Sequence, residues 1–231
     1  MGIIVQLAIS WLIIWFYEKG NLSILGLGPT RKRLVDFAVF FFITALCCST
    51  GFLLRMYFGN EQWRVNPVLN FTLLVEGVWW NIKSVLFEEL VFRGVLFYLL
   101  IKILGTTKAI IISAIAFGIY HWFSMEALGN IRQMAIIFII TGVMGVVYAY
   151  GYAKTFSLYI PCAIHFGWNL TQNFIFSDGV IGHGIFIKTQ PQPTVTVSYL
   201  VYSVVVFFPI VSAWLINLIL LKRKKQVLPK N

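Results

Sequence analysis

The sequence predicts an all-α fold, a polytopic transmembrane helical bundle with about seven or eight membrane helices. Of the 231 residues, 59% are hydrophobic and only 11% are charged, whereas soluble domains typically have about 25% charged residues. Apolar runs of about 20 residues, long enough to cross a bilayer as a helix, recur along the chain. We therefore expect residues 1–231 to form a single integral-membrane domain.

The net charge of +10 does not indicate nucleic-acid binding, because the positive residues gather at the ends of apolar segments. Two clusters are the richest, at residues 31–33 and 222–225. Such clusters are typical of cytoplasmic flanks that touch anionic lipid. The lipid bilayer is thus the expected partner of these residues, and the C-terminus is expected to be cytoplasmic.

Apolar runs and turn residues divide the chain into helices at about 3–17, 34–54, 84–104, 109–124, 131–150, 156–175 and 197–220. The first of them is interpreted as a retained helix, since no positive segment precedes it and no small-residue cleavage site follows. Residues 55–67 and 176–196 are polar and predict loops. Residues 68–82 are less apolar and rich in tryptophan, which predicts a short span or an interfacial helix.

Parity of the crossings favours the interfacial alternative for residues 68–82. Both basic clusters should be cytoplasmic, so an even number of crossings must separate them. The six other predicted helices between the clusters satisfy this condition, and a seventh crossing would not.

One apolar run, residues 85–104, carries three charged side chains. They are Glu88, Glu89 and Arg93. A charge at membrane depth costs about 2.5–3.5 kcal/mol on insertion scales, so such residues usually face the protein interior, form pairs or take part in chemistry. On a helix, Glu89 and Arg93 lie four residues apart in the order that favours an ion pair. Glu88 projects about 100° away from that pair and is the candidate catalytic carboxylate.

Two later apolar segments place histidines at membrane depth. Phe117 and His121 are four residues apart in one segment, and His165 and Asn169 have the same spacing in the other, so each pair shares a helix face. A single intramembrane histidine is more often a packed core residue. Together with Glu88, however, the two histidines can converge on one point, because bundles build polar sites from facing helices. The alternating direction of successive helices supports this convergence. Glu88 is expected near the start of its helix and His121 near the end of the next, so antiparallel packing would place both at a similar depth.

These side chains fit two mechanisms. Two histidines and a glutamate are ligand types of a catalytic zinc site, so Glu88, His121 and His165 could bind Zn²⁺ or another divalent metal with water in the open position. Alternatively, Glu88 acts directly as general base on a water molecule, with help from His121. His165 and Asn169 could then donate to an oxyanion. The second mechanism needs no metal.

The ordered set of motifs resembles a known family. Glu-Glu-x-x-x-Arg begins at Glu88, Phe-x-x-x-His ends at His121, and His-x-x-x-Asn begins at His165. This order, spacing and placement on successive helices are similar to the three motifs of the CPBP family, the CAAX proteases and bacteriocin-processing proteins that are also called the Abi family. Each motif alone is weak, whereas the ordered set is specific. The resemblance covers about residues 84–175, the motif-bearing core.

The resemblance implies an intramembrane endopeptidase related to the type II CAAX prenyl endopeptidases. Its substrate would be a membrane-embedded, prenylated or otherwise lipidated peptide. Glu88 and His121 would activate water, while His165 and Asn169 would complete the site. The family is often called a metalloprotease family, although a metal-free glutamate mechanism is also argued for it. The other motif residues would support the site structurally: Glu89, Arg93 and Phe117.

Two alternatives to a protease stay open. The first is a non-proteolytic membrane protein, such as a bacteriocin self-immunity or scaffold protein that retains the site. The second is a proton-coupled or ion-coupled transporter, which would use the buried carboxylate and histidines as a relay. The parity of crossings also places Glu88 and His121 towards the non-cytoplasmic side, whereas the resemblance favours cytoplasmic substrates.

Overall fold

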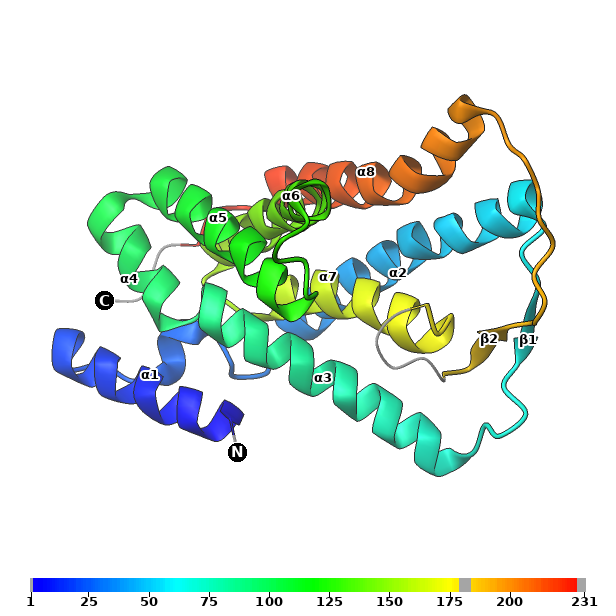
Figure 1. The fold of residues 1–231 in the computed structure, drawn as a ribbon. Helices are drawn as coiled ribbons and strands as arrows, with labels where there is room; N and C mark the ends of the chain where they lie inside the picture. The colour runs from blue at the N-terminus through cyan, green and yellow to red at the C-terminus, as the bar shows by residue number, and fades with distance from the viewer. Residues whose placement is uncertain (1, 179–183, 228–231) are drawn as a thin grey trace. The chain divides into compact units, whose positions relative to one another are not determined.

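The computed structural model of the protein describes residues 2–178 and 184–227 and is mostly helical, as predicted (Figure 1). In chain order, the elements are α1 (Gly2–Glu18), the 3₁₀ turn η1 (Leu22–Leu25), α2 (Arg31–Gly59), β1 (Trp63–Val65), α3 (Phe71–Arg93), α4 (Val95–Leu104), α5 (Thr106–Ser124), α6 (Ile131–Thr155), α7 (Tyr159–Leu170), the π-helical turn η2 (Thr171–Ile175), β2 (Phe186–Lys188) and α8 (Tyr199–Arg223).

Within the described residues, four helices are long and apolar enough to cross a membrane: α2, α5, α6 and α8. Helix α1 is also apolar but has only 17 residues. The chain therefore has the helices of a membrane protein, while the larger number of seven or eight membrane helices stays a prediction. The predicted loop at 176–196 and the basic tail contain residues 179–183 and 228–231, which lie outside the described residues.

The helix that carries the glutamates differs from the prediction. We expected one helix over residues 84–104 and a separate interfacial segment over residues 68–82. Instead, residues 71–82 of that segment and the glutamates form one continuous helix, α3. The side chain of Asn70 accepts a hydrogen bond from the Leu73 amide at 2.9 Å and starts this helix. Glu88 consequently lies near the end of its helix, not near the start as predicted.

Gly94 separates α3 from α4. The backbone turns so sharply there that a Cβ atom would overlap the carbonyl oxygen of Leu90, so only glycine fits this conformation. The chain then follows the short α4 to a second turn at Gly105, whose φ of 81° is in the left-handed region, and returns along α5 (Figure 1). Gly94 thus divides the helix expected at residues 84–104, whereas the turn at Gly105 lies between two helices that the sequence predicts.

The chain forms two compact units, which are described separately. Unit 1 contains residues 1–38, 86–163 and 218–231, and unit 2 contains residues 39–85 and 164–217. Helices α2, α3, α7 and α8 contribute residues to both units. The single integral-membrane domain stays a prediction.

In unit 1, α5 packs along α6, and α1 packs against α4. At the end of α1, the Glu18 carboxylate accepts hydrogen bonds from Lys102 at 2.6 Å and from the Tyr98 hydroxyl at 2.8 Å. The hydrogen bond with Glu18 raises the pKa of the Lys102 ammonium. The Tyr152 hydroxyl donates to the Ile24 carbonyl at 3.1 Å, which joins the segment after α1 to the last turns of α6.

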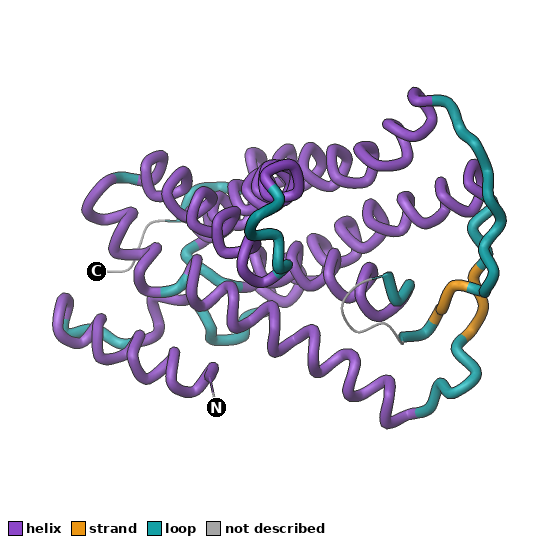
Figure 2. Tube along the Cα trace, viewed as in Figure 1, coloured by secondary structure: helices purple, strands orange, loops and turns teal. Residues whose placement is uncertain are grey.

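Unit 2 contains two strands that the sequence did not predict. β1 and β2 pair in antiparallel fashion, with Trp63 opposite Lys188 and Val65 opposite Phe186 (Figure 2). Each strand has only three residues and lies in a segment predicted as a loop. Three residues are too few for a strand pattern to be recognised, and the partner strand is more than a hundred residues away.

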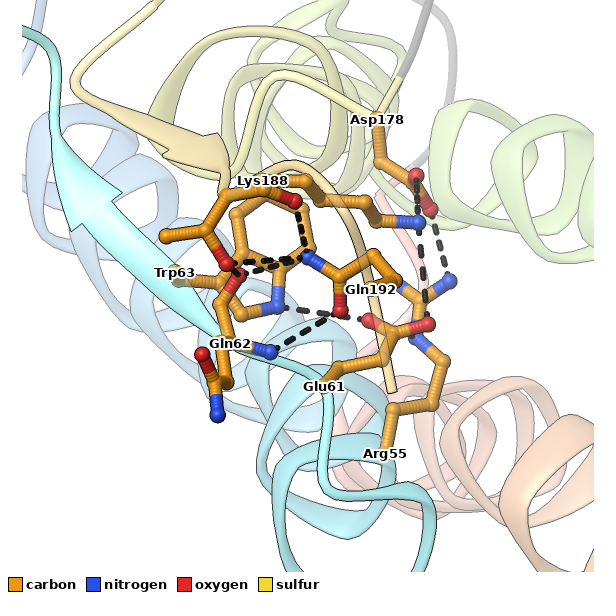
Figure 3. Close-up of polar contacts among 8 residues, drawn as sticks. Arg55, Glu61, Gln62, Trp63, Asp178, Lys188 and Gln192 are labelled. Atoms are coloured by element: carbon orange, nitrogen blue, oxygen red, sulfur yellow. Dashed lines mark hydrogen bonds and ion pairs between the residues drawn. The ribbon is translucent and has the colours of Figure 1, made fainter. Parts of the chain in front are cut away.

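Four charged side chains form a closed ring beside these strands (Figure 3). Arg55 lies 2.7 Å from Asp178 and 3.7 Å from Glu61. Lys188 lies 2.9 Å from Asp178 and 3.6 Å from Glu61. Because every cation contacts both acids, the ring joins the end of α2 to the residues just before β1, to β2 and to the segment that follows η2.

Aromatic rings pack beneath the charges. Phe52 and Phe176 stack with their centroids 4.1 Å apart, and Trp63 lies edge-on to both. A cavity of about 660 Å³ opens beside the strands and is lined by Met56, Glu61, Gln62, Trp63, Phe176, Phe186 and Thr189. No residue of the predicted catalytic set lines this cavity, so we assign it no part in the chemistry.

We expect Asp178→Asn to lower the melting temperature by a few degrees, because it weakens two contacts of the ring. The four side chains are 23–31% exposed, so each pair contributes only about 0.2–1 kcal/mol. Thermal unfolding of the detergent-purified protein measures the effect. Arg64→Gln, on the exposed face of β1, is the matched control and should leave the melting temperature unchanged. An equal loss in both variants would contradict the role of the ring.

Candidate active site

In unit 1, the last turns of α3 and α5 bring Glu88 and His121 together. The Oε2 atom of Glu88 lies 3.9 Å from Nε2 of His121. Both side chains are nearly buried, with exposed fractions of 12% and 10%. The pairing arises because the chain reverses direction at Gly105, about midway in sequence between the two residues. A carboxylate and an imidazole thus face each other in a nearly buried position.

The contacts of His121 define its tautomer. Its Nδ1 atom lies 2.8 Å from the carbonyl oxygen of Phe117, and a carbonyl only accepts hydrogen bonds, so Nδ1 carries the proton. In the neutral imidazole, Nε2 is then an acceptor directed at Glu88. The Phe117 ring lies edge-on to the imidazole at 4.4 Å, which limits rotation of the ring.

The separation of Glu88 and His121 suits a third group between them. At 3.9 Å the two atoms are too far apart for a direct hydrogen bond, which spans about 2.7–3.2 Å. A water molecule about 2.8 Å from each atom would fit this distance. So would a divalent ion with ligands at about 2.0–2.2 Å and a small adjustment of the side chains.

Arg93 supports Glu88 and His121 indirectly, through its neighbours. Its guanidinium lies 3.2 Å from the Glu89 carboxylate, and both side chains are completely buried. It also donates to the Gly145 carbonyl at 3.2 Å and lies 4.2 Å from the centroid of the Phe117 ring. Phe117 in turn contacts His121, so the predicted structural pair is connected to the imidazole through one aromatic ring.

Two residues of α6 take part in this support and were not predicted from the sequence. The Tyr148 ring lies 5.1 Å from the Arg93 guanidinium and 5.9 Å from the Phe117 ring. A Cβ atom on Gly145 would lie only 3.2 Å from both Arg93 and Phe117, so glycine allows their close approach. A glycine and a tyrosine within an apolar run carry no signal of such a role until α6 is known to face Arg93.

The second histidine motif belongs to unit 2. His165 is buried, with 3% of its surface exposed, and Asn169 is half-buried one turn further along α7. Gly167 lies between them, and a Cβ atom there would meet the backbone of Phe41, so α7 approaches α2 closely at this point. The structure therefore brings together the motif residues of unit 1, and the convergence of His165 and Asn169 with them stays a prediction.

Comparison with known families agrees with these motifs. Residues 70–171 match the family model described as type II CAAX prenyl endopeptidase Rce1-like. The match supports the CAAX protease family for this region. Its match confirms the resemblance predicted from the three motifs and covers all of their residues. Neither the curated proteins nor the solved structures that were compared include a match.

The match to the CAAX protease family indicates the general reaction and the general class of substrate. It supports an intramembrane protease of the CAAX type that acts on membrane-associated prenylated peptides in general. Together with the four apolar helices, it identifies a membrane protein. The family does not decide between metal and glutamate chemistry, nor does it assign individual catalytic residues in this chain.

We expect Glu89→Gln to destabilise the protein, because it leaves the buried Arg93 without its counter-charge. Removing one partner of a fully buried pair costs about 3–5 kcal/mol, which corresponds to a melting temperature lower by on the order of 10 °C. Thermal unfolding in detergent tests this. The neighbouring Glu88→Gln serves as control and should melt within a few degrees of the wild type. Equal losses in both variants would refute the separate roles of the two glutamates.

Proposed function

We propose that the protein is an intramembrane endopeptidase whose nucleophile is a water molecule activated by Glu88 and His121. The observation that carries the proposal is the buried Glu88–His121 pair, with its 3.9 Å separation and its Nε2 acceptor directed at the carboxylate. The CAAX protease family of residues 70–171 supports the reaction class.

In the proposed reaction, Glu88 is the general base. Its carboxylate takes a proton from water as the oxygen attacks the carbonyl carbon of the scissile bond. Nε2 of His121 accepts a hydrogen bond from the other O–H of that water and thereby orients it. Glu88 then passes its proton to the nitrogen of the leaving amine. His165 and Asn169 are proposed to donate hydrogen bonds to the oxyanion.

The same donors are chemically suitable for a metal. His121 donates Nδ1–H to a backbone carbonyl, which is the usual outer contact of a metal-binding histidine. The described residues contain no cluster of three His, Cys, Asp or Glu side chains placed to hold a metal ion. A site for Zn²⁺ or another divalent ion would therefore need His165 to join Glu88 and His121 as the third ligand, as the sequence predicts. A bound ion would lower the pKa of its water ligand towards neutrality. The protein would then be a metalloprotease rather than a glutamate protease.

The proposed substrate is a membrane-embedded or lipidated peptide. A site within apolar helices meets substrate most readily from the bilayer, and members of the family act on prenylated, membrane-associated peptides. We also propose that the C-terminus, which follows the basic end of α8, is cytoplasmic.

Glu88→Gln should abolish peptide cleavage while the protein stays folded. The substitution keeps the shape of the side chain and removes the base, and loss of a general base lowers turnover by about 10²–10⁴-fold. Cleavage of labelled membrane peptides in detergent or in proteoliposomes measures the loss. Glu76→Gln, in the first half of α3, is a matched control that should cleave like the wild type. Normal turnover by Glu88→Gln would exclude the proposed base.

Metal analysis separates the two forms of the mechanism. If Glu88, His121 and His165 hold a divalent ion, the purified protein should contain close to one equivalent, and His121→Ala should lose it. Activity should then disappear with a strong chelator and return when Zn²⁺ is added. Full activity after prolonged chelation, with no metal in the protein, would establish the metal-free form.

A further inference from the structure

The positive charge of unit 1 is gathered at one end. It comes from the ends of α1, α4, α6 and α8 and from the starts of α2 and α5. The residues concerned are Lys19, Arg31, Lys32, Arg33, Lys102, Lys108, Lys154, Lys222, Arg223, Lys224 and Lys225. We call this the basic end.

Direct contacts join these segments, although they are far apart in the sequence. Lys224 at the end of α8 forms an ion pair with Asp36 in α2 at 2.6 Å. The Lys154 ammonium donates to the Lys224 carbonyl at 3.2 Å, and the Val227 amide donates to the Lys154 carbonyl at 3.0 Å. The two basic clusters and the end of α6 therefore lie at the same end of unit 1.

Glu88 and His121 lie at the other end. Trp122, the residue after His121, donates its indole N–H to the Met134 carbonyl at 2.9 Å. A Cβ atom on Gly118 would contact Phe138. His121 is thus level with the first two turns of α6, whereas Lys154 is in its last turn. About 18 residues at 1.5 Å each separate these levels by about 27 Å, close to the 30 Å of the bilayer hydrocarbon.

Among the residues of unit 1 that the structure describes, the end near His121 has no comparable excess of positive charge. The turn from α5 to α6 carries Glu126 and Arg132, whose charges cancel. Lysine and arginine near the ends of membrane helices remain on the cytoplasmic side during insertion, where anionic headgroups also attract them. The uneven distribution of positive charge in unit 1 therefore indicates which of its ends faces the cytoplasm.

We infer that the basic end binds the anionic headgroups of the cytoplasmic leaflet and that Glu88 and His121 act in the outer half of the membrane, on a peptide presented from the non-cytoplasmic side. The orientation rests on unit 1 alone, while the peptide substrate rests on the proposed function. The substrate class is accordingly an exported peptide or the outer segment of a membrane protein. A protein prenylated in the cytoplasm would reach the basic end and not the catalytic pair.

The orientation of unit 1 does not depend on the number of membrane crossings. The parity of the predicted helices pointed the same way, but it counted one crossing at residues 84–104 and none at residues 68–82. The structure instead has α3 over residues 71–93 and a separate α4. The contacts of Lys224, Lys154 and Trp122 give the direction from within one unit.

Labelling of single cysteines tests the orientation without any need for activity. Thr106→Cys probes the turn between α4 and α5, and Leu128→Cys probes the exposed turn between α5 and α6. The background lacks the native cysteines, which are Cys47, Cys48 and Cys162. In intact cells, a membrane-impermeant maleimide should label Leu128→Cys several-fold more than Thr106→Cys. In inside-out vesicles the preference should reverse. The opposite pattern would overturn the inference.

A charge-removal variant tests the cause of the orientation. Replacing Lys222, Arg223 and Lys225 with glutamine leaves the pair of Lys224 and Asp36 intact but removes much of the basic end. We expect both cysteines to be labelled from both sides in this variant, and weaker binding of the purified protein to vesicles of phosphatidylcholine with phosphatidylglycerol. Unchanged labelling and unchanged binding would contradict a role of these charges.

Peptide cleavage by vesicles of opposite orientation tests the proposed substrate class. A peptide added outside should be cleaved by right-side-out vesicles and not by sealed inside-out vesicles, and Glu88→Gln should remove the cleavage. Cleavage by inside-out vesicles alone would overturn the inference even if the protein is a protease. If no peptide is cleaved while the cysteine pattern is as expected, the proposed function fails and the orientation stands.

Discussion

The buried ion pair of Glu89 and Arg93 is the constraint on which the candidate active site depends. A guanidinium with no exposed surface is tolerated at membrane depth only if its charge is compensated. Glu89 compensates it from one turn earlier on the same helix, and the Gly145 carbonyl adds a second acceptor from α6. Since both contacts use Arg93, the end of α3 can pack against α6 in only a small range of positions.

That constraint extends to the imidazole through aromatic rings. Arg93 lies against Phe117, and Phe117 contributes both its ring and its backbone carbonyl to His121. The helical period then explains why two adjacent glutamates serve different purposes. Glu89 is directed at the arginine, while Glu88, about 100° further round the helix, is directed at Nε2 of His121. The charged pair thus helps to orient Glu88 and His121, the proposed catalytic pair, without being part of it.

The family and the charge distribution describe different properties of the protein. The match of residues 70–171 to the CAAX protease family indicates a reaction class. The basic residues lie mostly at helix ends, and several of them are outside the matched region. We propose that they govern how the helices insert, and so the side from which a substrate arrives. Proteins with the same motifs can therefore meet different substrates if their flanking charges differ.

Composition and motif spacing determined the class of fold, the CAAX protease family and the residues that form the buried pairs. These are local properties. The hydrophobicity of a helix decides whether it lies in lipid or in water, and side chains four residues apart lie on the same face of a helix. Three features could not be read in this way. Gly94 divides the expected motif helix because of a backbone turn, Gly145 and Tyr148 act only through contacts with α3 and α5, and β1 pairs with a strand more than a hundred residues away. Each depends on which segments become neighbours, and only packing of the folded chain decides that.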